Sequence, residues 1–555
     1  MVKFLLFYFC LISYSSQAQT VGWFFSLPGS ADGYILFPPT GSDTTYLIDK
    51  CGKKIHTWKS NYHPGLAAHL LANGNLLRAG TTNNPQFQGG GTGGIIEKFD
   101  WNGTLLWTYM ISSDTDCQHH DVYQLPNGNV LAIAWESHTS IDAIENGRNP
   151  ANVGAKMWSD KIMEIQPVGI DSGIVVWQWR AWDHLIQDFD STRLNYGVVA
   201  DHPELININL VTLSQINSDW LHCNSVQFDS VTNQLLISSH NLDEVFILDH
   251  STTKSEVASH SGGVSGHGGD LMYRWGNPRN YGRGTIDDQK LFDQHNAQRI
   301  DAGFPGSGKI LVFNNGVGRV GTDYTSVETF TLPAMVGNNY PIETDSAYEP
   351  DASDWIYTAN PQNSFFCFVM GGAQRIWNGN TIICDAGNGH FFEVDSNGNE
   401  IWKYVNPVSF NGITEQGNTP FQNSSFRCTY LAYDYPGLAG HSLVPGAPIE
   451  KNPLSYVCYN NVPTEVDEPA ASDKNLIAYP NPFTNNFNIH IPISLNHAVL
   501  RIRDVLGKIL YQDLDFSSAS ESDISIELPN FKGILILSVN DASGQHVWNA
   551  TMVGF

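Results

Sequence analysis

An internal repeat constrains the fold of this chain more than any other feature. The triplet Asn-Gly-Asn lies between two short apolar runs at residues 73–75, 127–129 and 378–380. Asn-Gly between apolar runs predicts a tight hairpin in which both central residues adopt positive φ. A repeated hairpin at this scale indicates that one small structural unit recurs along the chain.

A second phrase follows the first within each unit. It has an Asp or Asn-Gly turn and then a short run that contains a tryptophan, at Trp107, Trp177 and Trp402, and more loosely at Trp58. Each unit is therefore predicted to hold four short antiparallel strands. Several such units arranged about an axis form a β-propeller, so we expect an all-β chain in which these tryptophans pack between neighbouring blades.

The charge of the chain limits its partners. Lys and Arg number 29 against 55 Asp and Glu, which gives a formal net charge of −26. Such a surface repels nucleic acid and anionic membranes. An anionic small-molecule substrate would need a locally positive pocket.

The N-terminus predicts export. Lys3 precedes the apolar run from Phe4 to Ile12, and small residues before Gln19 form a cleavage site, so residues 1–18 are expected to be a signal peptide. No segment is long and apolar enough to span a bilayer. Of eight cysteines, Cys10 lies in this peptide and seven remain, an odd number from which no disulfide pairing follows.

The repeat pattern stops near residue 460. We expect a propeller over residues 19–460, an acidic Pro-containing linker over 461–474 and a small C-terminal β-sandwich over 475–555. Tyr479-Pro-Asn-Pro-Phe483, Gly507-Lys508 and Phe531-Lys-Gly533 resemble the type A sorting domain of type IX secretion substrates. The resemblance implies transport by the type IX machinery across an outer membrane, and a secreted or cell-surface protein.

Histidines gather at one position of the repeat. His120 and His222 each lie seven residues before a hairpin turn, and His295 heads a similar phrase. We therefore expect all three at the start of the innermost strands, with His222 and His295 pointing into one funnel at the axis and His120 nearby. Imidazoles that converge in this way suit either a metal ion or a small oxyanion. Arg319, in Asn-Asn-Gly-Val-Gly-Arg, favours the oxyanion, because its planar guanidinium matches a tetrahedral anion.

The sequence here resembles the bacterial arylsulfate sulfotransferases, which are six-bladed propellers. His222-Cys-Asn-Ser-Val, Gln294-His295, Asn314-Asn-Gly-Val-Gly-Arg319 and Gly389-His390-Phe-Phe carry the resemblance, which runs from about residue 20 to 450. It implies that His390 attacks the sulfur of an aryl sulfate and becomes sulfated. It also implies that His222, His295 and Arg319 bind the sulfuryl oxygens and that a phenol then accepts the group. Neither a nucleotide sulfate donor, a cofactor nor a metal is implied.

Two other functions remain open on the sequence. One is a non-catalytic propeller that binds a sulfated or phenolic ligand or a protein partner. The other is a metal-dependent hydrolase that uses the histidines. His240, in Ser-Ser-His-Asn, follows His222 along the chain and has no role on the sequence alone.

Overall fold

The computed structural model describes residues 18–210, 218–456 and 458, and in the C-terminal part 477–479, 483–491, 495–504, 508–518, 522–529, 531, 533–540 and 546–554. Within these residues the chain is almost wholly β, and the only α-helix is α1 (Ser140–Glu145). The predicted signal peptide, apart from its last residue, and the predicted linker lie outside the described residues. The structure contains no described helix with the length and apolar composition of a membrane span.

Six antiparallel sheets of four or five strands make up the part before residue 432. The first joins β29 (Thr429–Leu431), β2 (Tyr34–Phe37), β3 (Thr44–Asp49) and β4 (Lys54–Lys59). The second contains β5 (Pro64–Leu70), β6 (Leu76–Thr81), β7 (Gly94–Phe99) and β8 (Leu105–Met110). The third contains β9 (Asp116–Gln124), β10 (Val130–Thr139), β11 (Lys156–Val168) and β12 (Ser172–Arg180).

The remaining three sheets follow in chain order. The fourth contains β15 (Cys223–Asp229), β16 (Gln234–Ser239), β17 (Glu244–Asp249) and β18 (Tyr273–Trp275). The fifth contains β19 (His295–Arg299), β20 (Ile310–Asn314), β21 (Ser326–Phe330) and β22 (Trp355–Thr358). The sixth contains β23 (Gly372–Arg375), β24 (Thr381–Asp385), β25 (His390–Val394), β26 (Glu400–Val405) and, at its outer edge, β1 (Gly22–Ser26).

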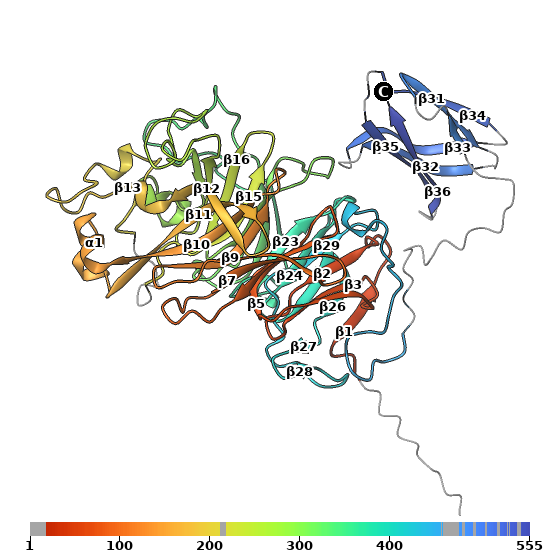
Figure 1. Ribbon diagram of the computed structural model, residues 1–555, viewed down its shortest axis with the longest axis horizontal. Coiled ribbons are helices and arrows are strands. Elements are labelled where there is room, and N and C mark those ends of the chain that lie inside the picture. The colour runs from red at the N-terminus through yellow and green to blue at the C-terminus, as the bar shows by residue number, and fades with distance from the viewer. Residues whose placement is uncertain are drawn as a thin grey trace, which may run out of the picture.

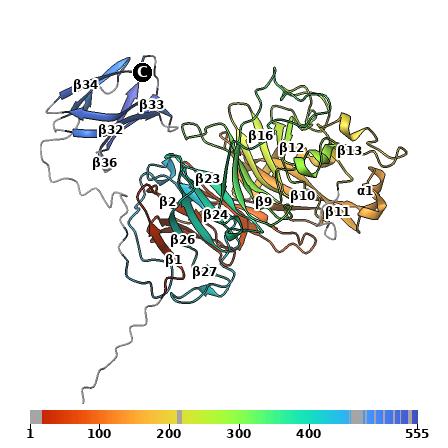
Figure 2. The same cartoon turned by 180° about the vertical axis from the view of Figure 1, so that it is seen from behind.

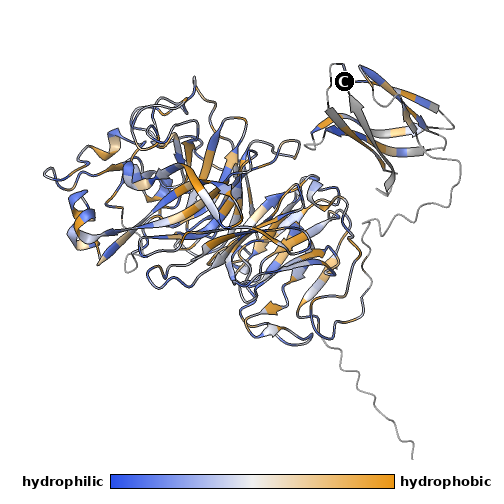
Figure 3. Cartoon of the chain, viewed as in Figure 1, coloured by the Kyte–Doolittle hydropathy of each residue, from blue (hydrophilic) through white to orange (hydrophobic). Residues whose placement is uncertain are grey.

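Short strand pairs supplement these sheets. They are β13 (Leu185–Ile186) with β14 (Ile206–Asn207), and β27 (Val408–Ser409) with β28 (Gly412–Ile413). In the main sheets the middle strands are the most buried, as in β16, where all six residues are buried. Figure 3 shows the apolar residues concentrated in these strands.

The first strands of successive sheets contact one another. Hydrogen bonds link Val226 N to Asp121 Oδ2 (3.3 Å) and Gln298 Nε2 to Ala373 O (2.6 Å). Gln374 of the sixth sheet then bonds both the N–H and the C=O of Tyr430 in β29, which belongs to the first. The two ends of this part of the chain therefore meet, and Figures 1 and 2 show the red strand β2 beside the cyan strands β23 and β24 from both sides.

Tryptophans connect neighbouring sheets, as the sequence predicts. Each indole N–H donates to the next sheet or to the segment that follows it: Trp58 to Asp100 O, Trp107 to Ser172 O, Trp177 to Thr252 Oγ1, Trp275 to Pro350 O and Trp402 to Lys50 O. The large ring fills the space between two sheets while its polar edge finds an acceptor, a combination that suits indole.

The Asn-Gly hairpins form where predicted, but with a different turn. At the first of them only Gly74 has a positive φ (83°), whereas Asn73 does not. Gly74 N–H donates to Leu71 O and Leu71 N–H to Asn75 O, so the loop has three residues with glycine in the left-handed position. The prediction that both central residues adopt positive φ is therefore wrong, because the extra residue moves the left-handed conformation onto the glycine alone.

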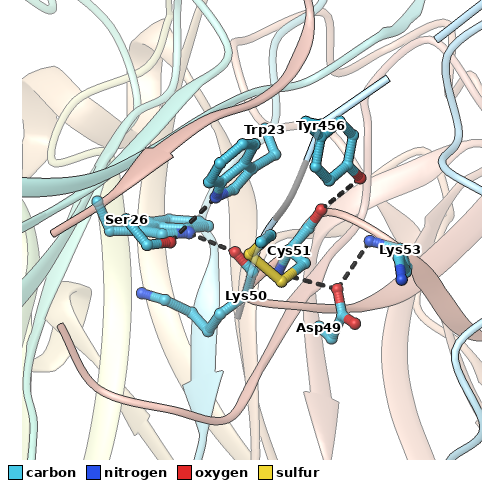
Figure 4. Close-up of a disulfide and its surroundings, with 9 residues drawn as sticks. Trp23, Ser26, Asp49, Lys50, Cys51, Lys53 and Tyr456 are labelled. Carbon is cyan, nitrogen blue, oxygen red and sulfur yellow. Dashed lines mark hydrogen bonds between the residues drawn. A yellow bond between two sulfur atoms is a disulfide. The ribbon is translucent and has the colours of Figure 1, made fainter. Parts of the chain in front are cut away.

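One disulfide joins distant parts of the chain. Cys51, in the β3–β4 turn, pairs with Cys458, 407 residues later. Figure 4 shows Tyr456 beside it, where its hydroxyl donates to Cys51 O (2.7 Å) and its ring packs on Trp23 at 4.8 Å. The other described cysteines, Cys117, Cys223, Cys367, Cys384 and Cys428, are buried and free.

The C-terminal strands form two sheets of their own. One orders β30 (Ile477–Tyr479), β31 (Asn486–Ile491) and β34 (Ser522–Glu527), and the other β33 (Ile509–Ser518), β32 (Leu495–Asp504), β35 (Gly533–Asn540) and β36 (His546–Gly554). Apolar side chains from both sheets, among them Phe487, Leu500 and Leu537, form a separate buried cluster. Pro480, Asn481 and Pro482 of the predicted sorting motif lie outside the described residues.

Candidate functional site

Five histidines form one continuous group, called here the histidine cluster: His119, His120, His222, His240 and His295. Ring centroids lie 5.2 Å apart between His119 and His120, and 4.5 Å apart between His120 and His222. The series continues to His240 at 5.0 Å and from there to His295 at 5.2 Å. The structure thus brings together the three histidines that the sequence places at one position, and adds His240.

Backbone bulges in the first strands aim these side chains. The pairing of β9, β15 and β19 with the following strand shifts register at this point. His120 and His222 have left-handed φ values of 52° and 53°, a conformation that is uncommon outside glycine. In β19 the left-handed residue is Asn296, so His295 lies one position earlier than the repeat alignment implies.

His222 carries the positive charge of the cluster. Its Nδ1 lies 2.5 Å from Asp219 Oδ2, and the other carboxylate oxygen accepts from Trp135 Nε1 at 2.9 Å. Burial alone would lower the pKa of His222, but the charge and hydrogen bond of Asp219 outweigh it and raise the pKa above its ordinary value. Asp219 therefore favours the imidazolium form of His222, and no hydrogen bond among the described residues takes up its Nε2.

His240 is uncharged, and its tautomer follows from its neighbours. Asn241 Nδ2 donates to Asp219 O, so Asn241 Oδ1 accepts from His240 Nδ1 at 2.8 Å. Burial, followed by the positive charge of His222, holds the pKa of His240 well below its ordinary value. With the proton on Nδ1, Nε2 of His240 carries a lone pair.

His295 is uncharged for the same reasons. Asn315 Nδ2 donates to Cys367 O and Met370 O, which orients Asn315 Oδ1 to accept from His295 Nδ1 at 2.8 Å. Burial lowers the pKa of His295 to about 3. His295 is nearly inaccessible, at 2% exposure, whereas the His240 side chain is 20% exposed. His240 is thus the uncharged ring that a ligand reaches more easily.

A carboxyl group with a pKa in the physiological range adjoins His240. Asp293 Oδ1 lies 3.8 Å from His240 Nδ1, and its side chain is 31% exposed. Burial is the main cause that raises the pKa of Asp293 to about 6. A group that exchanges a proton near neutral pH is suited to general acid-base chemistry.

A glycine-rich segment, residues 89–94, lies against the cluster. His120 N–H donates to Gly91 O (2.9 Å), and a Cβ added to Gly91 would lie 2.1 Å from His120 Cε1. A Cβ at Gly90 would lie 3.5 Å from His222 Cε1. The glycines are needed for this close approach, a role that their position between β6 and β7 does not reveal in the sequence.

The predicted oxyanion ligand Arg319 is held by its own sheet. Its Nε donates to Tyr324 O (3.2 Å), and its Nη2 donates to Ser326 Oγ (2.5 Å) and lies 3.5 Å from Glu328. Its ring contacts are with Phe292 and Tyr324. Among the described residues, none of the hydrogen bonds, ion pairs or ring contacts of Arg319 reaches the histidine cluster.

A different arginine adjoins the cluster. Arg427, just before β29, forms an ion pair with Asp121 (2.8 Å) and donates to Asn224 O (2.8 Å). Its guanidinium lies over Phe426, whose ring is 5.8 Å from that of His120. The positive charge of Arg427 contributes to the low pKa of His295. The position of Arg427 beside the cluster could not be predicted from the sequence, because β29 comes late in the chain and joins the first sheet.

The predicted nucleophile His390 lies in the sixth sheet. It begins β25, two strands outward from β23, and its Nδ1 is 3.9 Å from Asp385 in its own sheet. Burial is the main cause that lowers its pKa, and the charged groups that act on it are Asp385, Lys403 and Glu400. The side chain is 39% exposed. Among the described residues, no hydrogen bond, ion pair or ring contact joins His390 directly to His222 or His295, and the path between them runs through Asp385, Cys367 and Asn315.

The histidine cluster does not have the geometry of a metal site. Among the described residues, the only group of three or more His, Cys, Asp or Glu side chains that could hold a metal ion is His184, His260 and Asp270, elsewhere in the fold. The cluster offers instead one ring with a raised pKa, His222, several uncharged imidazoles and, beside them, the titrating carboxyl of Asp293. This set suits a small oxyanion and nucleophilic chemistry.

Comparisons with known proteins give the same two families that the sequence motifs resemble. The family model described as Arylsulfotransferase (ASST) matches residues 42–420. The model described as Secretion system C-terminal sorting domain matches residues 477–551. No curated protein matches the chain.

Solved structures resemble the chain only weakly. A protein of unknown function from Bacteroides caccae is 12% identical, covers 72% of this chain and 99% of its own, and gives a TM-score of 0.39. A catalytically inactive virginiamycin B lyase from Staphylococcus aureus, with quinupristin, is 10% identical over 70% and 89%, with a TM-score of 0.31. A putative 6-phosphogluconolactonase from Bacteroides fragilis is 9% identical over 73% and 99%, with a TM-score of 0.32.

The family model spans more than half of the chain, and its match lies over the sheets that carry the histidine cluster. The sorting-domain match in turn indicates export to the cell surface or beyond. The chain therefore belongs to the arylsulfotransferase family and ends in a type IX secretion sorting domain.

Proposed function

We propose that this chain is an aryl-sulfate sulfotransferase that transfers a sulfuryl group from a phenolic sulfate ester to a phenol through a sulfohistidine, without a nucleotide donor. The proposed domain organisation is a signal peptide cleaved after residue 18, a six-bladed propeller over residues 19–460, a linker over 461–474 and a sorting domain over 475–555. The type IX secretion machinery recognises the sorting domain and exports the chain. One observation carries the mechanism: a fixed imidazolium, His222, stands next to an uncharged ring, His240, whose Nε2 lone pair is free.

We assign the attack on sulfur to His240, in place of His390. An imidazole lone pair is a competent nucleophile, and among the rings whose pKa is lowered, His240 is more exposed than His120 and His295. In the first step a bond forms between His240 Nε2 and sulfur, and the sulfur–oxygen bond to the aryl group breaks to release a phenolate. His222 stabilises the charge on the sulfuryl oxygens, as a preorganised cation does.

The second step returns His240 to its starting state. Asp293, as a carboxylate, takes the proton of the incoming phenol, whose oxygen attacks sulfur and breaks the bond to Nε2. A pKa of about 6 lets Asp293 accept this proton at neutral pH. His295 is an uncharged neighbour in the cluster, and Arg427 adds positive charge near it.

The test uses the purified mature chain with a chromogenic aryl sulfate, with and without phenol. We expect phenol-dependent release of colour that falls at least about a thousandfold in His240→Asn and about a hundredfold in His222→Gln. His390→Asn is the matched control, because it removes an imidazole outside the cluster and should leave the rate unchanged. Loss of activity in His390→Asn alone would overturn the assignment.

The other outcomes point to other functions. Binding of the aryl sulfate without release under any acceptor would favour a binding propeller. Release that ignores phenol and stops with a chelator would favour a metal-dependent hydrolase.

A further inference from the structure

A second histidine group lies outside the histidine cluster. His184 follows the short 3₁₀ turn after β12, and His260 and Asp270 lie in the segment between β17 and β18. Asp270 Oδ1 is 2.7 Å from His184 Nδ1 and 2.8 Å from His260 Nδ1. The three donor atoms lie within 4.8 Å of one another. Two imidazole nitrogens and one carboxylate oxygen thus converge on one point.

The hydrogen bonds of His184 require a positive species at this point. Val257 O can only accept, so His184 Nε2, 2.9 Å away, carries a proton. An uncharged His184 then turns the lone pair of Nδ1 toward the carboxylate of Asp270, which is repulsive. The pair is buried, at 0% and 5% side-chain exposure, so water cannot screen the repulsion. Either an extra proton or a metal cation must lie between the two groups.

The donor set matches a divalent transition metal. Two imidazoles with one carboxylate is a set that Zn²⁺ uses, with a fourth position left for water. A ligating histidine usually donates its other N–H to a carbonyl or carboxylate, as His184 does to Val257. Tetrahedral bonds of about 2.0–2.1 Å place donor atoms about 3.3 Å apart. Both contacts with Asp270 Oδ1 must lengthen by about half an ångström. His260 can move because its side chain is 60% exposed, and the buried pair His184 and Asp270 must open by the same amount.

The surrounding chain is packed closely around the point of convergence. A Cβ added to Gly269 would lie 2.0 Å from Val257 O and 2.6 Å from His184 Nε2. Gly269 O also accepts from Trp179 Nε1 of β12 at 2.8 Å. A metal here would fasten the 23-residue connection 250–272, which has no strand of its own, to the third sheet.

We infer that His184, His260 and Asp270 form a binding site for one divalent transition-metal ion of the zinc type. The ion ties segment 250–272 to the third sheet. The site is separate from the histidine cluster and does not depend on the proposed sulfuryl transfer.

Calorimetric titration of the metal-free mature chain with Zn²⁺ tests the inference, with Co²⁺ titration as a spectroscopic readout. We expect about one ion per chain and the visible absorption of tetrahedral Co²⁺. In His260→Ala the affinity should fall at least about tenfold. His202→Ala is the matched control, because His202 also pairs its Nδ1 with a carboxylate, Glu204, at 2.8 Å and is 47% exposed. It should bind like the wild type.

Two results would overturn the inference. One is absence of Zn²⁺ and Co²⁺ binding by the folded wild-type chain, which would leave His184 as a buried imidazolium. The other is binding that persists unchanged in both His260→Ala and Asp270→Asn. Circular dichroism checks that each variant is folded, and Zn²⁺ should slow proteolysis within 250–272 in the wild type but not in His260→Ala.

Discussion

Three neighbouring side chains of the histidine cluster hold different charges at neutral pH. Asp219 keeps His222 protonated, burial keeps His240 neutral, and burial brings the pKa of Asp293 to about 6. Groups whose environments separate their pKa values in this way can act as cation, nucleophile and base in one site.

The pH dependence of transfer follows from these shifts. We expect a bell-shaped rate profile. The acid limb, near pH 6, reports loss of a proton from Asp293, and the alkaline limb, above 6.5, reports loss of the proton from His222. Asp293→Asn should lower the rate by about a hundredfold and remove the acid limb. A profile whose acid limb is unchanged in Asp293→Asn would contradict this role.

The same shift of Asp293 has a consequence for stability. Its pKa is higher in the folded chain than the ordinary value of about 4, so the folded state binds the proton more tightly. This contribution is complete below pH 4 and is lost as the pH rises through about 6. Urea unfolding at several pH values, compared between wild type and Asp293→Asn, would measure it.

The glycine segment gives a matched pair of variants. Gly91→Ala and Gly103→Ala both place alanine at a positive φ, 80° and 83°, so the backbone strain is similar. Only at Gly91 does the new methyl meet a side chain, the ring of His120, whereas Gly103 faces open space. We expect about a hundredfold loss of transfer in Gly91→Ala alone, because a displaced site group costs this much. Steady-state kinetics of the two variants would measure the transfer rate of each. Equal losses of rate in both variants would contradict a role for the glycine-rich segment.

Part of the histidine cluster could be predicted from the sequence, residue by residue. The repeat alignment predicts the convergence of His120, His222 and His295, because first strands meet at one axis. It could not reveal Arg427 or the role of His240, which depend on the pairing of distant strands. His390 matches a family motif locally and begins β25, and its part in the site stays a prediction.

At the scale of strands and turns, the indole bridges between sheets are the recurring device. Each places a polar N–H where the next sheet has an acceptor, so the pattern Asp-Gly-turn-Trp in the sequence predicts it. The turn type was harder to predict, because Asn-Gly suits both the two-residue and the three-residue hairpin, and only the register of the paired strands distinguishes them.

Removal of one indole N–H tests the bridges. Trp107→Phe keeps most of the buried ring but loses the hydrogen bond to Ser172 O, at 2.8 Å. We expect the free energy of unfolding to fall by about 1 kcal/mol, or more where the carbonyl is left without a partner. Chemical denaturation measures this. An unchanged midpoint would mean that the bond is replaced by water.

At the scale of the whole molecule, the set of sheets is completed by contacts between the first and last strands of the part before residue 432. β29 pairs with β2, β1 with β26, and the Cys51–Cys458 disulfide lies beside them. The sequence predicts repeated units, but which segment completes the first sheet depends on contacts across about 400 residues. No local pattern carries that information, and the odd number of cysteines gives no pairing.

Loss of the disulfide should weaken the folded state. Cys458→Ser opens a loop of 407 residues, and the free energy of unfolding should fall by about 2–4 kcal/mol. Thermal unfolding with and without reductant measures the effect, and reductant should not affect the variant further, because the other described cysteines are buried and free. A wild-type midpoint insensitive to reductant would contradict this role.

Mapping of the covalent intermediate tests the central claim most directly. The mature chain is mixed with an aryl sulfate without acceptor, stopped in base to protect the acid-labile bond, digested and sequenced by mass spectrometry. The account predicts one sulfuryl group on the peptide that contains His240, its loss on addition of phenol, and its absence in His240→Asn. A sulfuryl group on His390, or turnover with no modified histidine, would contradict it.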